Sequence, residues 1–317
     1  IAARAGHSVT VWSRTDEIVE SINHEHVNKK YLTETRLPDA VHATSDIHSA
    51  VDDADFVILA TPSHVTRNVL TRLLPACTPD MLFIGAAKGI EVTTGMRMSE
   101  VVHDVFDGTF EPRYVCISGP SFAKEVVVGN PTAIVAAGND LEDCRTVQVL
   151  LGVDNLRIYT NDDLIGVELG GAVKNVMAIA AGMVTGLGYG SNSLAALITR
   201  GLAEMTRLAL RMGARMETLM GLAGLGDLVL TSTGSLSRNR YVGEELGKGR
   251  SLSEISATMS ETAEGVKTTE AVWRLAQQLE VDTPITAEVH AVLYGNKSPR
   301  DAVSELMTRP LREEFQK

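Results

Sequence analysis

A lysine inside a long apolar stretch is the residue of this sequence whose surroundings most favour chemistry. Between Gly166 and Ile198 the only charged residues are Glu168 and Lys174. Apolar and small residues recur around Lys174 at the spacing of an α-helix, which predicts a helix whose buried side includes this lysine. Because a buried ammonium group loses hydration, its pKa should fall, and Lys174 could then exchange a proton near neutral pH.

Two simpler interpretations of this helix involve no chemistry. The Lys174 side chain could extend along the helix to reach solvent, or the helix could cross a membrane. Residues 175–199 carry no charge, but glycines and the polar run 189–193 interrupt them. The apolar stretch therefore falls short of the roughly 20 residues that a bilayer requires, and we predict no membrane insertion.

The elements that must position Lys174 alternate in the first half of the chain. Short apolar runs separated by helical patterns predict parallel strands with helices on both faces. The strands are expected at 8–13, 55–61, 81–87, 113–118, 132–137 and 156–160, and the helices at about 16–27, 63–74, 96–106, 120–128 and 140–151. Ligands of such folds bind beyond the carboxyl ends of the strands.

The second half of the chain is predicted to be helical almost throughout. Arg200, Glu204, Arg207 and Arg211 share one helix face, which we interpret as solvated. The segment 230–239 reads as a loop. Further helices are expected at 216–223, 240–248, 252–259, 265–280, 285–294 and 299–308. The predicted fold class is thus α/β plus all-α: a Rossmann-type dinucleotide-binding domain over 1–162 and a helical catalytic domain over 163–317, with the site between them.

The end of the first predicted strand bears on the choice of cofactor. In dinucleotide-binding folds this position meets the adenosine ribose, where an arginine suits the 2′-phosphate of NADP. Arg14 stands there and indicates NADP, although an exposed arginine beside a helix start explains it as well. The glycine-rich phosphate loop that should precede this strand is not in the sequence, and Gly221, Gly224 and Gly226 follow a predicted helix instead.

Three other strand ends carry groups suited to ligands. Residues 60–62 open a helix that could line a nicotinamide or pyrophosphate site, and Lys88 places a cation at the end of the next strand. Ser121 follows the run 118–120, where we expect it to cap a helix whose backbone N–H groups face an anion. A surface lysine and an ordinary helix cap are the alternatives.

A hydroxyl, a guanidinium and an amide follow one another at Ser237, Arg238 and Asn239. Together they are a donor set suited to a phosphate, although a surface loop can have the same composition. Asp227 stands between apolar residues, where it could orient Lys174 or bind a substrate hydroxyl. The histidines show no ligand spacing, so no metal site is predicted.

Composition limits the classes of function. The length of 317 residues suits two domains, and 44% hydrophobic with 22% charged residues is typical of a globular protein. The formal net charge of −11 disfavours nucleic acid as a partner. Three cysteines without paired spacing fit a reducing, cytoplasmic setting. Because Ile1 opens what reads as a helix end capped by Gly6, we expect the first strand and the glycine-rich loop upstream of Ile1.

Taken in order, the motifs resemble the bacterial type of NAD(P)-dependent glycerol-3-phosphate dehydrogenase. The resemblance extends from Ile1 to about Arg309 and rests on AAKGIE, SGPSFAKE, IGVELGGAVKNV, ALITRGLAEM, AGLGDLVLT, SRNR and PIT. It implies reversible hydride transfer between dihydroxyacetone phosphate and sn-glycerol 3-phosphate, with NADPH/NADP or NADH/NAD as cofactor, in glycerophospholipid synthesis. The implied partner is a small phosphorylated three-carbon substrate, and a homodimer is left open.

The resemblance also implies roles for individual residues. Lys174 would be the catalytic proton donor and acceptor. The substrate would be bound by Lys88, Gly119, Ser121, Lys174, Asp227, Ser237, Arg238 and Asn239. The cofactor would be bound by Trp12, Arg14, Tyr31, Lys88, Ala123, Arg238 and Glu264.

Two other functions are compatible with these residues. A 3-hydroxyacid or ketopantoate-type reductase shares the cofactor domain and a helical lysine but prefers carboxylate substrates. A non-catalytic NADP-binding interaction protein would keep the fold without turnover. The sequence leaves the choice between NADP and NAD and the oligomeric state undecided.

Overall fold

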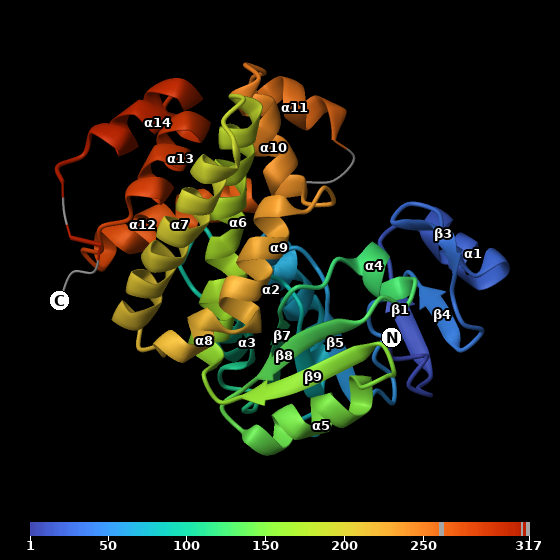
Figure 1. The fold of residues 1–317 in the computed structure, drawn as a ribbon. Helices are drawn as coiled ribbons and strands as arrows, with labels where there is room; N and C mark the ends of the chain where they lie inside the picture. The colour runs from blue at the N-terminus through green and yellow to red at the C-terminus, as the bar shows by residue number, and fades with distance from the viewer. Residues whose placement is uncertain (260–262, 312, 315–317) are drawn as a thin grey trace.

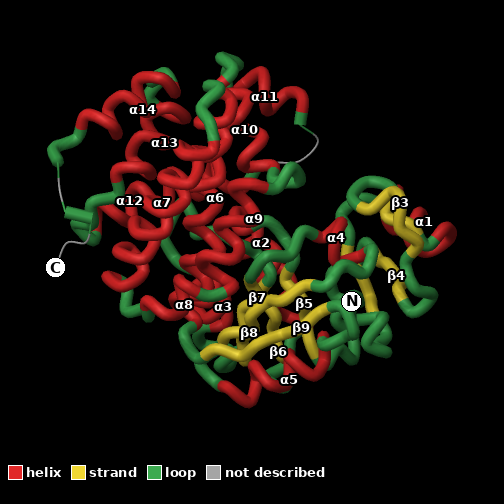
Figure 2. The backbone as a smooth tube through the Cα atoms, viewed as in Figure 1, coloured by secondary structure: helices red, strands yellow, loops and turns green. Residues whose placement is uncertain are grey.

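The structure is a computed structural model that describes residues 1–259, 263–311 and 313–314. Strands occupy the first half of the chain and helices the second (Figure 1). Figure 2 shows the same division by secondary structure, with the strands gathered at one end of the molecule and the helices at the other. The predicted fold class, a dinucleotide-binding domain followed by a helical domain, is confirmed.

The central sheet has five strands in chain order, of which β6 is buried on both faces. They are β5 (Phe56–Leu59), β6 (Leu82–Gly85), β7 (Arg113–Ser118), β8 (Thr132–Ala137) and β9 (Leu156–Asn161). All neighbours are parallel except β7 and β8, which are antiparallel. Successive side chains of β6 point to opposite faces: Ile84 packs with α5 (Leu141–Leu151), while Phe83 packs with α2 (Ser63–Leu73) and α3 (Met98–Phe106).

Four further strands lie outside this sheet, and only the first of them was predicted from the sequence. β1 (Val9–Trp12) leads to α1 (Asp16–Glu25) and pairs in parallel with β4 (Val41–Thr44). Between them, β2 (Val27–Asn28) and β3 (Leu32–Arg36) form a short antiparallel ribbon. β2, β3 and β4 were missed because short runs with mixed polarity carry little periodic signal.

A gap separates β1 from β5. Among the described strands, none pairs with both of them. The pair of β1 and β4 is therefore a sheet separate from the five strands β5 to β9. The gap contains a cavity of about 400 Å³ with mainly apolar walls that include Val11 and Ile117. Ile58 also lines it and is 39% exposed, although it lies in the middle of β5.

The helical half surrounds α6 (Leu164–Gly186), which directly follows β9. A short helix, α4 (Ala123–Val127), lies earlier in the chain, between β7 and β8. α6 has the length and the apolar composition to cross a membrane. Within its most apolar 18 residues, however, 94% are buried inside the protein, so α6 is a core helix. Gly182 lets α10 approach closely, because a Cβ atom there would lie 2.0 Å from the Arg240 carbonyl oxygen. The other helices are α7 (Ser191–Arg211), α8 (Met216–Met220), α9 (Asp227–Thr233), α10 (Arg238–Gly247), α11 (Leu252–Thr258), α12 (Glu264–Gln278), α13 (Pro284–Tyr294) and α14 (Pro299–Thr308).

Two predictions for the helical half are wrong. The segment 230–239 is mostly helical, since α9 continues to Thr233 and α10 begins at Arg238. Glu204 does not lie on a solvated face: it is 1% exposed and accepts hydrogen bonds from Ile285 N, Thr286 N and Thr286 Oγ1 at the start of α13. A buried carboxylate that caps a distant helix cannot be recognised from local spacing.

Candidate active site

The Lys174 amine is buried at the centre of the molecule and is held by α9. The residue is 6% exposed, and its Nζ donates hydrogen bonds to Asp227 Oδ1 at 3.0 Å and to Thr231 Oγ1 at 2.7 Å. The Lys174 side chain therefore does not reach solvent along the helix. Small residues before it let neighbouring backbone come close, as a Cβ atom at Gly170 would lie 2.6 Å from the Ala223 carbonyl oxygen.

Lys88, beyond the end of β6, meets the other oxygen of the same carboxylate. Its Nζ donates to Asp227 Oδ2 at 2.6 Å and to the Gly119 carbonyl oxygen at 2.9 Å. Ser121 donates its hydroxyl to the same carbonyl at 3.0 Å. The structure thus brings together five of the predicted substrate residues, Lys88, Gly119, Ser121, Lys174 and Asp227.

The predicted helix cap at Ser121 is wrong. α4 begins at Ala123 with Phe122 in the cap position, and the Ser121 hydroxyl is turned to Gly119 instead. The tight turn at Gly119, where φ is 136°, brings that carbonyl within reach of both Ser121 and Lys88.

The electrostatics of this cluster favour an amine that titrates near neutrality. Burial, followed by the nearby charge of Lys88, lowers the pKa of Lys174 to about 8, against the opposing effect of Asp227. Burial alone would raise the pKa of Asp227, but Lys88 and Lys174 outweigh it and hold that pKa below its usual value. Asp227 therefore remains a carboxylate between two cations, and Lys174 is the group poised to exchange a proton.

A chain of amide hydrogen bonds connects this cluster to α10 and α12. Asn175 donates to the Lys88 carbonyl oxygen at 3.1 Å, and Asn239 donates to Asn175 Oδ1 at 2.9 Å. Asn239 Oδ1 in turn accepts from Gly265 N at 2.9 Å. The Asn239 amide, predicted to bind phosphate, is thus partly engaged within the protein, with one N–H left over.

The predicted phosphate donors lie at the start of α10. Ser237 caps this helix by accepting from Arg240 N at 3.2 Å, and Arg238 begins its first turn with an exposed side chain. Glu264, at the start of α12, accepts from Ser63 N at 2.9 Å and so joins α12 to α2. Burial raises the pKa of Glu264, while the Ser63 N–H and the charges of Arg238, Lys174 and Lys88 oppose the rise. These cations therefore surround one common region.

Of the remaining predicted cofactor residues, Trp12, Arg14 and Tyr31 belong to the first forty residues and Ala123 begins α4. Trp12 ends β1, donates from Nε1 to the Ser45 carbonyl oxygen at 3.2 Å, and has the Arg72 guanidinium 5.5 Å from its ring centre. Arg14 and Ala123 are exposed. Tyr31 lies between β2 and β3 beside Lys30, and among the described residues no hydrogen bond or ring contact joins it to Trp12 or Lys88.

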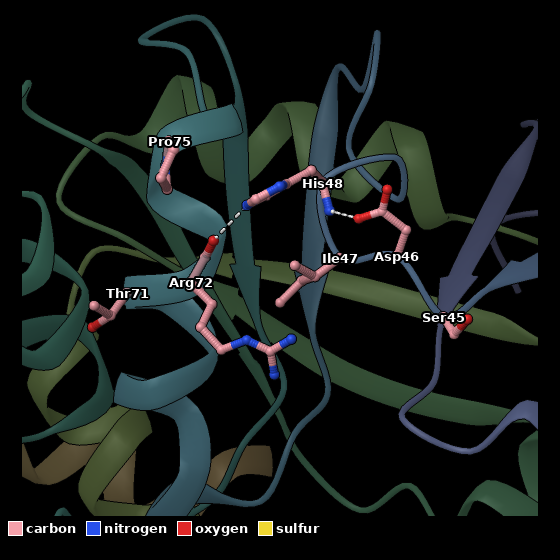
Figure 3. Close-up of a pocket in the computed structure, with 7 residues that line it drawn as sticks. All are labelled: Ser45, Asp46, Ile47, His48, Thr71, Arg72 and Pro75. Carbon is pink, nitrogen blue, oxygen red and sulfur yellow. Dashed lines mark hydrogen bonds between the residues drawn. The ribbon is translucent and has the colours of Figure 1, made fainter.

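A surface cavity of about 430 Å³ adjoins Trp12 between the end of α2 and the segment after β4. Figure 3 shows His48 reaching the carbonyl oxygen of Arg72 across it, at 3.0 Å. The walls are formed by Ser45, Asp46, Ile47, His48, Thr71, Arg72 and Pro75. This cavity and the one between β1 and β5 both lie away from Lys174, so the assignment of the active site rests on side-chain contacts.

The residues present fit a nicotinamide dinucleotide at its two ends. Ser13 and Arg14 follow β1, and neither is acidic, which suits an adenosine phosphate. Lys88 and the N-terminal end of α2, after β5, flank the proton-transfer cluster, where a nicotinamide ring would lie. The described residues hold no group of histidine, cysteine or acidic side chains arranged for a metal ion.

Thr231 and Asn175 belong to the cluster but were not predicted. Thr231 lies four residues after Asp227 and accepts from Lys174 while donating to Asp227 Oδ1 at 3.1 Å. A helix predicted over 227–233 would have placed Asp227 and Thr231 on one face, because they are four residues apart. Asn175 follows Lys174 in an otherwise apolar helix, and a buried amide in such a position indicates a polar partner.

Comparisons with known proteins agree over nearly the whole chain. Residues 1–144 match the model of the NAD-dependent glycerol-3-phosphate dehydrogenase N-terminus, and residues 163–304 match the model of its C-terminus. The glycerol-3-phosphate dehydrogenase (NAD(P)+) of Koribacter versatilis is 51% identical over 311 residues, which cover 98% of this chain and 92% of that protein. The solved glycerol-3-phosphate dehydrogenase of Coxiella burnetii is 38% identical, with a TM-score of 0.93 over 97% of this chain and 94% of that one.

The predicted alternative, a ketopantoate-type reductase, is only a distant structural neighbour. The ketopantoate reductase of Ralstonia eutropha is 14% identical, with a TM-score of 0.60 over 95% of this chain and 94% of that one, which shows a shared fold alone. The two family models and the curated relatives decide between the alternatives. The chain belongs to the NAD-dependent glycerol-3-phosphate dehydrogenase family.

Proposed function

We propose that this chain interconverts dihydroxyacetone phosphate and sn-glycerol 3-phosphate, with Lys174 as the catalytic acid and base. The observation that carries the proposal is the buried amine of Lys174, whose pKa is lowered to about 8 by burial and by Lys88. A bound NAD(P)H supplies the hydride. The protein's own task is then to manage the charge and the proton at the substrate oxygen.

The hydrogen bonds of Lys174 leave one proton for the substrate. An ammonium group has three N–H donors, and Asp227 Oδ1 and Thr231 Oγ1 accept two of them. The third can point at the ketone oxygen, where negative charge develops during reduction. Donation of this proton stabilises that charge, and a positioned acid of this kind contributes about 10²- to 10⁴-fold to a rate. In the oxidation direction the neutral amine takes the proton back.

Lys88 and Asp227 keep the acid in place. Asp227 binds one lysine with each oxygen, so it separates the two ammonium groups and fixes the direction of Lys174 Nζ. Lys88, which is less buried than Lys174, offers its remaining N–H to the substrate oxygens. Gly119 and Ser121 shape the opposite wall of the same site.

The start of α10 is the proposed phosphate site. Arg238 supplies an exposed guanidinium, and the first turn of α10 supplies backbone N–H groups and the positive end of the helix dipole. The hydroxyl proton of Ser237 and the second amide N–H of Asn239 complete the donor set. Holding the phosphate here orients the three-carbon substrate toward Lys174, an effect of positioning.

The cofactor assignment rests on the same elements. We assign Trp12, Arg14 and Tyr31 to the adenosine end, and Lys88, Ala123, Arg238 and Glu264 to the remainder. Arg14 supports NADP over NAD. The product is the backbone of glycerophospholipids, so we place the enzyme in that synthesis and in the cytoplasm, where its three free cysteines stay reduced.

A substrate panel tests the proposal. The purified protein should oxidise NADPH when dihydroxyacetone phosphate is added, and should not do so with dihydroxyacetone, ketopantoate or a 3-oxoacid. Preference for the carboxylate substrates would contradict the proposed activity. NADPH binding in a calorimeter without turnover of any ketose phosphate would instead support a non-catalytic role.

A further inference from the structure

A second buried charge on α6 has no place in the reaction described above. Glu168 accepts hydrogen bonds from Ser99 N at 2.7 Å, from Ser99 Oγ at 2.6 Å and from Arg97 Nη1 at 2.7 Å. Ser99 lies in the first turn of α3, where a backbone N–H has no acceptor within the helix. Glu168 accepts from that N–H and so caps α3, and we call Glu168, Ser99 and Arg97 together the Glu168 cap. α3 belongs to the dinucleotide-binding half, so the cap connects the two halves of the molecule.

The Glu168 cap differs from the other buried polar connections between the halves. Those connections run from Lys88 to Asp227, from Asn175 to the Lys88 carbonyl, and from Glu264 to Ser63 N. Each of them includes a residue that we assign to substrate or cofactor. The Glu168 cap includes none, and its partner Arg97 is itself fixed by Glu100, through a 2.9 Å bond from Nη2 to Oε1.

We propose that Glu168 is a positioning residue for the reaction, which holds α6 against α3 so that Lys174 meets the substrate and the cofactor at the correct place. The proposal rests on the proposed role of Lys174. It assigns to Glu168 no contact with any ligand.

Helix geometry explains how a distant residue can have this effect. Glu168 and Lys174 are six residues apart, which is about 9 Å along the helix axis and roughly 120° around it. The Glu168 cap therefore restrains α6 from sliding along α3 or rotating about its own axis. Lys174 projects from a different side of α6. Because the Lys174 amine lies roughly 8 Å from the axis, a rotation of about 20° would move it by about 3 Å. A displacement of about 1 Å at a reacting group can cost about 100-fold in rate.

The chain offers a matched control in Glu204. It is also a buried carboxylate with three donors at a helix start, at 2.7–2.9 Å, but it joins α7 to α13 within the helical half. Burial raises the pKa of Glu168 and of Glu204, while their hydrogen-bond donors favour the charged form. Replacing either by glutamine puts an amide N–H where a donor now points. Glu168→Gln also removes one of the two carboxylates that bind Arg97, so it should cost more stability than Glu204→Gln, and the kcat of each variant is corrected for its folded fraction.

The test compares Glu168→Gln with Glu204→Gln in the full chain. We expect Glu168→Gln to lower kcat by about 10- to 100-fold, with the KM for dihydroxyacetone phosphate and the Kd for NADPH changed by less than about threefold, since no ligand contact is lost. Glu204→Gln should leave kcat within about twofold after correction for the folded fraction. Equal losses of kcat in the two variants, or no loss in Glu168→Gln, would overturn the proposal.

A measurement without cofactor separates this proposal from the assignment of function. The rate at which acetic anhydride modifies Lys174, followed by peptide mass spectrometry, should rise several-fold in Glu168→Gln and stay at the wild-type value in Glu204→Gln. An unchanged rate in Glu168→Gln would show that the cap does not hold Lys174, whatever the enzyme catalyses. A wild-type protein without ketose-phosphate turnover would contradict the proposed function, and the modification rates would still test the cap.

Ser99→Ala serves if Glu168→Gln does not fold. It removes one of the three donors, the hydroxyl at 2.6 Å, and keeps the backbone N–H. We expect a loss in kcat of a few-fold and a smaller rise in the modification rate of Lys174. Wild-type values for both quantities would overturn the proposal.

Discussion

The proposed proton-transfer cluster and the proposed adenosine end of the cofactor site are built in opposite ways. Lys174, Asp227 and Thr231 lie on two packed helices, are buried, and bind one another. Trp12 ends β1 of a two-stranded sheet, and Arg14 follows that strand and is exposed. In a buried cluster of side chains that hydrogen-bond to one another, replacing one residue disturbs the positions of the others. An exposed charged side chain contributes a modest binding affinity, which salt screens. The first region should therefore govern the rate and the second the choice of cofactor.

The largest effect should come from Lys174→Met, which removes the acid and keeps the volume of the side chain. We expect kcat to fall by about 10²- to 10⁴-fold, because the proposed proton donor is lost, while the Kd for NADPH stays near its wild-type value. Steady-state kinetics and calorimetry measure the two quantities. Lys248→Met is the control, since Lys248 is exposed at the end of α10 and should show wild-type turnover. Full turnover of Lys174→Met would remove the amine from the mechanism.

Asp227→Asn should have the next largest effect. The change leaves Lys88 and Lys174 without their shared carboxylate, and we expect kcat to fall by about 10- to 100-fold through misplacement of the Lys174 amine. Because Asp227 raises the pKa of Lys174, its loss should move that pKa below about 8. The pH profile of kcat for reduction should then begin its decline at lower pH. An unchanged profile would contradict the electrostatic role given to Asp227.

The wild-type pH dependence should differ in sign between the two directions of the reaction. Reduction needs the ammonium form of Lys174, so its kcat should fall as the pH rises through about 8. Oxidation needs the neutral amine, so its kcat should rise through the same range. Each limb should approach a tenfold change per pH unit away from the pKa, measured with both substrates in one buffer series. The same sign in both directions would exclude Lys174 as the titrating group.

The smallest effect is expected at the adenosine end. Arg14→Ala should raise the Kd for NADPH by about tenfold at low salt, through loss of a charge-assisted hydrogen bond in an exposed setting, and should leave the Kd for NADH unchanged. Calorimetry at two salt concentrations checks both values. Equal losses for the two cofactors would show that Arg14 does not read the 2′-phosphate.

The sequence alone was sufficient for the strands of the central sheet and for the type of each half. Apolar runs such as 81–87 alternate with helical patterns, and both faces of β6 are buried, as an uninterrupted apolar strand predicts. The sequence was also sufficient to predict that Lys174 is buried and has a lowered pKa, because its helix is otherwise apolar. These features are local, so composition and spacing determine them.

The partners of the buried charges were decided by the tertiary structure. Asp227 is 53 residues from Lys174 and 139 residues from Lys88, yet it binds both. Glu204 and Glu168 cap helices more than sixty residues away, and Glu204 was expected at the surface. Local spacing cannot specify such pairs, because a buried carboxylate needs donors from whichever helix start the packing brings to it. The sequence determined which residues must find a partner, and the packing of α6 against α3 and α9 determined which partner each one found.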